Sequence, residues 1–232
     1  MPVDLKRCRC CGQMRGGLCG HIYNRSPEGF RSFVQSHDLK RHQTLGPTLP
    51  CGRHLAILAN GRAKLSSLAA SGEDRLIEFV STGDIGELQN DRRGAVFATA
   101  LERARICVLS EDLADTMSRD SAFLRSLSDQ RAREVARSRM RIRLLCIAES
   151  TDRLAAFLLT QLRKVAIPDT RRRIDLPYSR EDIGFYLNLS PGTVSRSFSA
   201  LKTAGMIDTH SPTKISCIPH AHWTTILTHV HS

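Results

Sequence analysis

Residues 179–205 constrain the fold of this chain more than any other stretch, because they read as two short helices joined by a tight turn. Ser179 is a favourable N-cap for the first helix, and Asp182 three residues later can complete a capping box. Asn188 follows the last apolar residue of that helix, and asparagine tolerates the left-handed backbone conformation that ends many helices. The first helix is therefore predicted to end just before Asn188.

A second helix is predicted to begin after Ser190, which caps it and is followed by Pro191. Proline suits the first helical position, because the N–H that it lacks has no partner there. Helical spacing makes one face of this helix apolar, and that face is expected to be buried. The buried face consists of Val194, Phe198 and Leu201.

The opposite face of the second helix is polar and rich in hydroxyl groups. Its N-terminal end is the part that enters the major groove in helix-turn-helix proteins. An ordinary helical hairpin inside a globular core is the alternative explanation of residues 179–205. The residues predicted to contact DNA are Ser190, Gly192, Thr193, Ser195 and Arg196, with Ser197 beside them.

The two helices also show a family resemblance, in the sequences SREDIGFYL and TVSR. They resemble the helix-turn-helix of the Crp/Fnr superfamily of bacterial transcription regulators, and more specifically its Fnr/FixK branch. Downstream, the sequence AGMIDTHSPTKISCI alternates like two strands around a Ser-Pro turn, which is typical of a wing. One departure is Gly192, where that branch usually has a glutamate.

The resemblance covers nearly the whole chain and implies an α+β fold. That fold comprises an N-terminal β-roll, like the jelly roll of cyclic-nucleotide-binding domains, a long dimerisation helix and a C-terminal winged helix-turn-helix. It also implies a homodimer that binds a palindromic site in double-stranded DNA and interacts with RNA polymerase. The expected segments are 1–21 (cysteine-bearing), 22–115 (β-roll sensor), 116–150 (dimerisation helix) and 151–232 (DNA-binding domain).

The charge balance agrees with a nucleic-acid partner. The 232 residues include 34 Lys and Arg against 23 Asp and Glu, a formal net charge of +11, and such a balance favours polyanions. Acidic lipids, ribosomes or a role in solubility would also fit the basic charge.

No apolar run approaches a membrane span and the N-terminus has no apolar signal core, so a cytoplasmic location without membrane contact is expected. No hydrolase or glycine-rich phosphate motif is found, so no enzymatic activity is expected.

Half of the eight cysteines lie near the N-terminus, in a glycine-rich segment with few core-forming residues. In a reducing compartment such thiols are not expected to form a disulfide framework. Thiolates in a glycine-rich loop can bind a soft metal or an iron–sulfur cluster. A structural zinc and exposed thiols on a disordered tail are the open alternatives. These cysteines are Cys8, Cys10, Cys11 and Cys19.

The spacing Cys8-x2-Cys11-x7-Cys19 is similar to the N-terminal cysteine motif of oxygen-sensing Fnr proteins of alphaproteobacteria, in which Cys10 has no counterpart. The fourth ligand of that family lies in the sensor domain, and Cys107, within FATALERARICVLS, falls at the matching place. The resemblance implies that Cys8, Cys11, Cys19 and Cys107 bind a [4Fe–4S] cluster when oxygen is scarce. The alternative explanation of Cys107 is that it is a small buried hydrophobic residue, as a lone cysteine in a strand usually is. Strands are expected at residues 61–68, 75–80, 83–88 and 95–109.

The same β-segment suggests a competing function. The sequence IGEL, which includes Glu87, precedes Arg92 and Arg93 and resembles the phosphate-binding cassette of cyclic-nucleotide domains. In that cassette a Glu binds the ribose hydroxyl and an Arg binds the cyclic phosphate. A small residue usually follows the cassette Arg, whereas Arg93 stands here, so a degenerate loop is the favoured explanation. A regulator gated by a cyclic nucleotide or other small ligand, or a cluster-free FixK-type regulator, is the alternative function.

A long helix is expected from residue 121 to about residue 149. An apolar seam runs along it, interrupted by Arg131 and Ser138, and suits a dimer contact. Arginines flank the seam and would repel those of a partner helix, which favours a marginal dimer; a solvated basic face is the plain alternative. A weak dimer suits a regulator, because a small bias then shifts its population. The seam comprises Leu124, Leu127, Val135, Ile142 and Leu145, and the arginines are at positions 133, 137, 139, 141 and 143.

Overall fold

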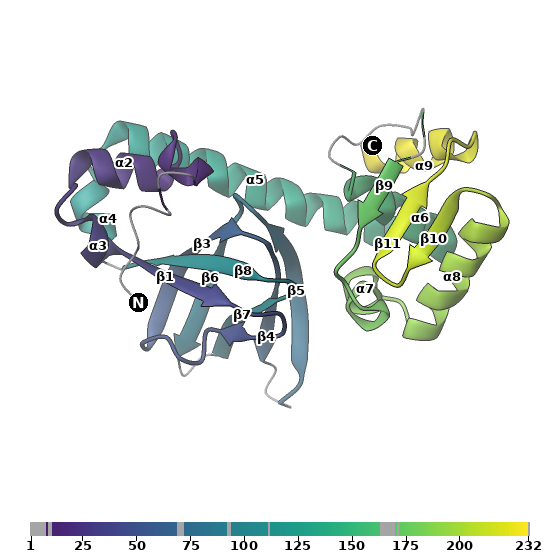
Figure 1. The fold of residues 1–232 in the computed structure, drawn as a ribbon, viewed down its shortest axis with the longest axis horizontal. Coiled ribbons are helices and arrows are strands. Elements are labelled where there is room, and N and C mark those ends of the chain that lie inside the picture. The colour runs from purple at the N-terminus through teal and green to yellow at the C-terminus, as the bar shows by residue number, and fades with distance from the viewer. Residues whose placement is uncertain are drawn as a thin grey trace. The chain divides into compact units, whose positions relative to one another are not determined.

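The computed structural model describes residue 8 and residues 11–68, 72–91, 94–110, 112–162, 170 and 172–231. The chain divides into two compact units, Met1–Ala136 and Arg137–Ser232. The boundary between them lies within the long helix α5 (Ser121–Cys146), which Figure 1 shows in teal. The finer division expected from the sequence, with a separate segment at 116–150, stays a prediction.

The first unit is built on an antiparallel sheet, as predicted for a β-roll. The strands follow the order β1-β8-β3-β6-β7-β4-β5, and β2 pairs with β7 at the side of this path. Sequence patterns predict the regions of β4 to β8, whereas β1 and β3 are not expected from them. The strands are β1 (Val34–Leu39), β2 (Thr44–Leu45), β3 (Gly52–Asn60), β4 (Arg62–Leu68), β5 (Asp74–Ser81), β6 (Ile85–Asp91), β7 (Gly94–Ala100) and β8 (Ala104–Leu109).

The two faces of this sheet enter different cores, because successive side chains of a strand point to opposite faces. Leu65 and Leu88 belong to one apolar cluster. Ile85 and Cys107 belong to a second cluster, which is completed by apolar residues of the helices. Figure 1 shows these helices gathered on one side of the sheet. They are α2 (Leu18–Arg25), α3 (Phe30–Phe33), α4 (Leu113–Met117) and the start of α5.

The N-terminal segment has more regular structure than its glycine content suggests. A short 3-10 helix, η1 (Gly12–Met14), precedes α2. Leu18, Cys19 and Ile22 are buried in the second cluster, where one face of α2 packs on the sheet. The expectation of a glycine-rich loop with few core-forming residues is therefore wrong for α2, because a short apolar stripe is enough when a sheet covers it.

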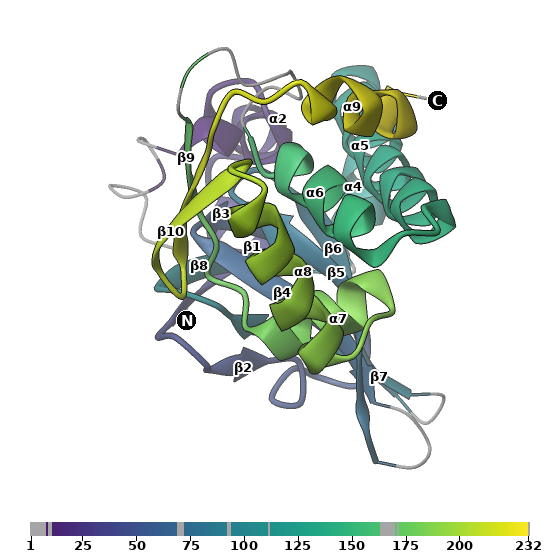
Figure 2. The ribbon, with the colours of Figure 1, turned by 90° about the vertical axis from the view of Figure 1, so that its right-hand side faces the viewer.

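The second unit combines helices with a small antiparallel sheet of order β10-β11-β9. The strands β10 and β11 form the hairpin predicted for the wing, whereas β9 is not expected from the sequence. Figure 2 shows α8 beside α6, α7 and β10. The elements are α6 (Ser150–Thr160), β9 (Arg172–Asp175), α7 (Arg180–Leu187), α8 (Pro191–Thr203), β10 (Ile207–Ser211), β11 (Lys214–Cys217) and α9 (His222–His231).

The last helix, α9, is another element that the sequence pattern did not predict. Its apolar side chains Trp223, Ile226 and Val230 are fully buried or nearly so. His222 donates a hydrogen bond from Nε2 to the Oδ1 of Asp152 in α6, at 2.9 Å. None of the helices in the described parts of the chain is long and apolar enough to cross a membrane.

Candidate nucleic-acid interface and candidate metal centre

The first helix of the predicted pair, α7, begins and ends as its sequence indicates. The Ser179 Oγ accepts a hydrogen bond from the Asp182 backbone N–H at 2.9 Å. The Asp182 Oδ2 accepts one from the Ser179 N–H at 3.2 Å, which completes the capping box. Asn188 ends the helix in the left-handed region, with φ 53° and ψ 50°. The capping predictions are confirmed.

Gly184 of α7 is required by the turn between the two helices. A Cβ atom at this position would lie 2.6 Å from the carbonyl oxygen of Leu189. Such a contact is shorter than real Cβ atoms show, and backbone cannot yield as a flexible side chain can. The turn therefore approaches α7 closely only because residue 184 has no side chain.

The second helix, α8, also has the predicted cap and core face. The Ser190 Oγ accepts a hydrogen bond from the Thr193 N–H at 3.1 Å, and Pro191 occupies the first turn. Val194, Phe198 and Leu201 are buried, as predicted. The placement of Ser197 on the free face is wrong, because it is 2% exposed and its hydroxyl donates to Ser150 Oγ of α6 at 3.4 Å.

The exposed N-terminal face of α8 has its own hydrogen-bond network. Arg196 donates from Nη2 to Thr193 Oγ1 at 3.0 Å, and Thr193 Oγ1 lies 2.9 Å from Ser190 Oγ. Ser195 donates from its hydroxyl to the Pro191 carbonyl at 3.0 Å. Gly192 adds no side chain, and a Cβ there would have only Arg196 Nη1 and Ser190 Oγ within contact range, both at 3.8 Å. These residues form one polar, accessible surface.

A groove of about 440 Å³ lies between α8 and the wing. It is lined by basic residues that the sequence reasoning missed, including Arg180, Lys202 and the imidazole of His210. The Arg180 guanidinium stacks 3.3 Å from the centroid of the Phe198 ring, and burial lowers its pKa. The basic residue directly after the Ser179 cap is the signal that could have identified this groove.

The structure brings the predicted metal-ligand cysteines into one region of the first unit. Cys19 of α2 and Cys107 of β8 are both buried in the second apolar cluster, and Cys8 packs against it. The Cys11 N–H donates to the Cys8 carbonyl at 2.8 Å. Cys10 lies outside the described residues. Within those residues, no three Cys, His, Asp or Glu side chains are arranged to hold a single metal ion.

These thiols act on one another electrostatically. Burial raises the pKa of Cys19 well above its ordinary value, and the neighbouring Cys107, Cys11 and Cys8 raise it further. Burial, followed by Cys8 and Cys11, raises the pKa of Cys107 to about 12, against a lowering effect of Arg105. Thiolates crowded in an apolar site repel one another and lack solvation, so they would ionise together only around a cation.

Helix α5 has an apolar stripe that the described chain leaves accessible. Leu124 is 45% exposed, Val135 48%, Ile142 60% and Leu145 37%. They lie eleven, seven and three residues apart, which are sums of the steps of three and four residues typical of a helix–helix seam, and the polar residues Arg131 and Ser138 occupy intermediate positions. Leu127 differs from the prediction, because it packs against the second cluster of the first unit instead.

Part of the predicted basic flank of α5 has a structural role. Arg141 donates from Nε to the Tyr186 carbonyl at 3.1 Å and from Nη2 to the Phe185 carbonyl at 3.4 Å. Its guanidinium also lies 4.8 Å from the centroid of the Tyr186 ring. Arg143 donates to the Val230 carbonyl of α9 at 3.3 Å. These two arginines therefore hold the second unit together, and they are not simply repulsive or solvated charges.

The chain is similar to known proteins in both sequence and fold. The model of the Crp-like helix-turn-helix domain matches residues 152–218. The regulatory protein HlyX of Actinobacillus pleuropneumoniae is 28% identical over 159 residues, covering 67% of this chain and 66% of HlyX. The nitrogen fixation regulation protein FixK of Bradyrhizobium diazoefficiens is 28% identical over 149 residues, 63% of each chain. The structure of FixK2 from Bradyrhizobium japonicum has a TM-score of 0.67 at 21% identity, covering 83% of this chain and 96% of FixK2.

Residues 152–218 thus form a Crp-like helix-turn-helix domain, and the chain as a whole is similar to regulators of the Crp/Fnr superfamily. Its relatives lie in the Fnr/FixK branch, as the sequence resemblance predicts. The chain spans slightly less than two thirds of the length of HlyX and FixK. The likeness to FixK2 shows the shared fold: a jelly-roll-like sheet, a long helix and a helix-turn-helix.

The acidic residue of the cassette-like sequence, Glu87, is paired with two arginines of the first unit. The Glu87 carboxylate lies 2.6 Å from the Arg53 guanidinium and 3.8 Å from that of Arg131 on α5. Its neighbours in β6, Ile85 and Leu88, show that Glu87 shares the face of the second cluster, opposite Leu88. Arg92 and Arg93 lie outside the described residues.

Proposed function

We propose that this Crp/Fnr protein is a transcription regulator that binds palindromic double-stranded DNA as a homodimer and responds to oxygen. In this proposal, Cys8, Cys11, Cys19 and Cys107 hold a [4Fe–4S] cluster. One observation supports this proposal most. The cysteines of the N-terminal motif lie in the same apolar region as Cys107, which belongs to a strand distant in sequence.

The accessible face of α8 supports the DNA-binding role. Its first two turns present Arg196 and hydroxyl groups without apolar cover, and arginine can bind O6 and N7 of guanine together. The groove beside it adds Arg180 and Lys202, which suit contacts to phosphate. Contacts to bases and contacts to phosphate are thus available from neighbouring side chains.

The four cysteines fit a cluster by the chemistry of their side chains. Thiolates are the usual ligands of iron–sulfur clusters, and a cationic iron core would offset the repulsion among them. When bound, the cluster supplies sensitivity to oxygen, because oxygen dismantles it. Cys19 and Cys107 tie α2 to β8, and this contact lies on the side of the sheet that α5 also covers.

The exposed stripe of α5 supports the homodimer. Val135, Ile142 and Leu145 are apolar side chains of one helix in contact with water, and a second copy of the helix would bury them. The polar interruptions at Arg131 and Ser138 limit the strength of that contact. A limited strength permits control by a bound group.

The relatives suggest the biological setting. HlyX is named a regulatory protein and FixK a nitrogen fixation regulation protein, and several other relatives are named anaerobic regulatory proteins. We therefore propose control of anaerobic, microaerobic or nitrogen-fixation genes, through interaction with RNA polymerase in the cytoplasm.

A cluster-free FixK-type regulator is the second candidate function, favoured by the similarity to FixK. Gating by a cyclic nucleotide is less favoured, because Glu87 is held by Arg53 and Arg131.

Purification without oxygen tests the cluster. The wild type is expected to be brown, with about four iron and four sulfide per chain, and to bind its DNA site. Cys107→Ser is expected to lose the iron and the DNA binding, because a hydroxyl is a harder and less acidic donor than a thiol. Cys51→Ser changes an exposed cysteine and is the matched control, expected to keep both. A Cys107→Ser protein with full iron content and DNA affinity would contradict the ligand set.

A further inference from the structure

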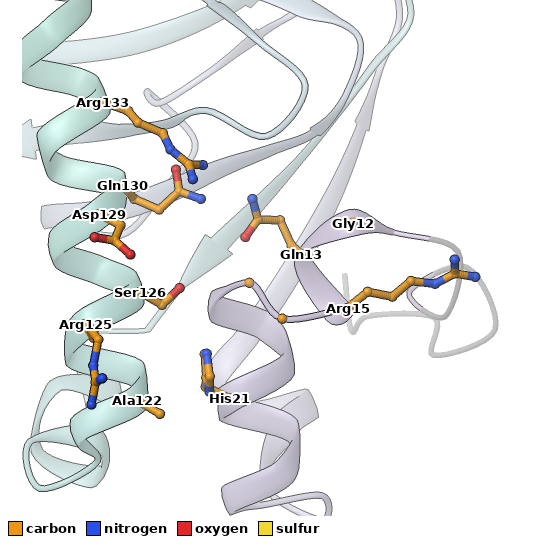
Figure 3. A pocket seen from close by; sticks show the side chains of 12 residues that line it. Gly12, Gln13, Arg15, His21, Ala122, Arg125, Ser126, Asp129, Gln130 and Arg133 are labelled. Carbon is orange, nitrogen blue, oxygen red and sulfur yellow. The ribbon is translucent and has the colours of Figure 1, made fainter.

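A cavity of about 530 Å³ lies in the first unit between the N-terminal segment and α5 (Figure 3). One wall consists of η1, the following glycines and His21 of α2. The other wall is the face of α5 that runs from Ala122 to Arg133. None of the predicted metal ligands lines it, so the cavity is distinct from the cysteine region. Its volume is in the range of sites that bind small molecules.

Two nearly buried glutamines face one another across this cavity. Gln13 is 7% exposed; its Nε2 donates to the Gly83 carbonyl at 3.1 Å, and its Oε1 accepts from the Leu18 N–H at 3.3 Å. Gln130 is 5% exposed, and its Oε1 has no hydrogen-bond partner among the described residues. Because buried amide groups are almost always paired, this orphaned group indicates a polar occupant: a donor to Oε1 or, with the amide turned by 180°, an acceptor for the Nε2 hydrogens.

The charge of the walls indicates the sign of that occupant. Arg125, Arg133 and His21 line the cavity, and Asp129 is the acidic side chain among the lining residues. Arg133 makes no hydrogen bond or ion pair with any described residue, and Figure 3 shows it pointing with Gln130 toward Gln13. A free guanidinium beside an amide that can rotate to present its NH₂ group suits an oxyanion.

We propose that this cavity binds a small phosphate or carboxylate anion, held by Arg133 and Gln130 opposite Gln13. A bound anion would join the N-terminal segment to α5 through polar contacts on both walls. It would thus act on the segment that contains the cysteine motif and on the helix that has the exposed seam. Binding of the anion would be a second chemical signal to the protein. The anion site does not depend on the proposed cluster.

Isothermal titration calorimetry on the full chain, at constant ionic strength, tests the site with inorganic phosphate and succinate as probes. The wild type is expected to bind at least one of them saturably. Arg133→Gln and Gln130→Leu are each expected to weaken that binding about tenfold or more, because each removes a hydrogen-bonding group from the anion. Arg119→Gln removes the same charge from an exposed position outside the cavity and is expected to bind like the wild type.

Hydrogen exchange locates the bound probe within the chain. Saturation with the bound probe is expected to slow amide exchange at residues 12–18 of the wild type and not of Arg133→Gln. A cavity filled only by water would give no saturable heat and no slowing for either probe, and this result would overturn the proposal. Equal weakening by Arg119→Gln, or unchanged binding in both cavity variants, would overturn it as well.

Discussion

Base recognition by a helix of this kind depends on single side chains at its first turn. Gly192 occupies a position with open space around it, where the Fnr/FixK branch usually has a glutamate. A glutamate there could accept a hydrogen bond from cytosine N4, and it would stand four residues before Arg196, a spacing that favours an ion pair. In the proposed DNA contact, this chain would therefore lack one base-contacting side chain and one side chain that could orient Arg196.

We expect Gly192→Glu to create a preference at one base pair at which the wild type discriminates weakly. Arg196→Ala is expected to lose roughly 1–3 kcal/mol of discrimination at a different base pair, because one arginine pairs with one guanine. Selection of binding sites from a random DNA pool, followed by competition titrations, measures both changes. Lys202→Ala is the control, and it is expected to weaken binding to all sequences alike. If the wild type and Gly192→Glu select the same consensus with the same sharpness, the base-reading role is wrong.

At this scale, the sequence predicts those features that depend on near neighbours. The capping box of Ser179 and the left-handed Asn188 follow from residues within one turn of the helix, and both are confirmed. Ser197 and Arg141 could not be assigned correctly in this way, because their partners, Ser150 and Tyr186, belong to other helices. A hydroxyl or a guanidinium is exposed by default, and only the packing of a second element reverses that expectation.

Among the helices, Arg153 of α6 joins the ends of two others. Its Nε and Nη2 donate to the Ile147 carbonyl at 2.9 and 2.7 Å, and its Nη1 donates to the Leu187 carbonyl at 2.9 Å. These carbonyls lie at or just beyond the C-terminal ends of α7 and α5, where helices leave acceptors unpaired. The Arg153 guanidinium thus provides hydrogen-bond donors to carbonyl groups at the C-terminal ends of both α5 and α7.

Arg153→Met is expected to lower the free energy of unfolding of the second unit by about 2–4 kcal/mol, because the acceptors lose charged hydrogen bonds. Urea unfolding followed by Trp223 fluorescence measures this change. The signal reports on the second unit, because Trp223 is the single tryptophan and is buried in that unit. Arg139→Met, at an exposed position of α5, controls for the loss of charge and is expected to leave the midpoint unchanged. Similar midpoints for both variants would contradict the role of Arg153.

Helices and strands could be predicted where their own sequence shows a strong pattern of apolar residues or turn residues. The wing hairpin and the strands from β4 to β8 show alternation or clear turns in the sequence. By contrast, β9 is short and gains its place by pairing with β11, and α9 is stabilised by contacts of Trp223 with the rest of the unit. The side of β6 that holds Glu87 likewise depends on strand pairing and on Arg131 of a distant helix.

For the molecule as a whole, α5 is the element on which the proposed inputs meet. The cysteine region and the anion cavity both involve the N-terminal segment beside the first half of α5. The exposed seam continues along the same helix, through Val135 to Leu145. Dimerisation is therefore the step through which either input would reach DNA binding.

The polar interruption of the seam at Ser138 gives the sharpest test of this idea. Ser138 is exposed and lies between Val135 and Ile142 in the stepwise pattern of the seam. Ser138→Leu would add apolar surface to the dimer contact, and a buried leucine contributes about 1.5–3 kcal/mol. The dissociation constant of the dimer is expected to fall about tenfold or more, which allows cluster-free protein in air to bind its palindromic site.

Sedimentation equilibrium of the cluster-free protein measures the dimer, and titration of the selected DNA site measures the consequence. Ala136→Leu is the matched control, because it adds a leucine to an exposed position of α5 away from the seam. It is expected to leave both measurements unchanged. If Ser138→Leu and Ala136→Leu strengthen association equally, the effect is general hydrophobicity and the seam is not the dimer contact. If Ser138→Leu dimerises tightly but binds DNA no better in air, then dimerisation is not the step that the cluster controls.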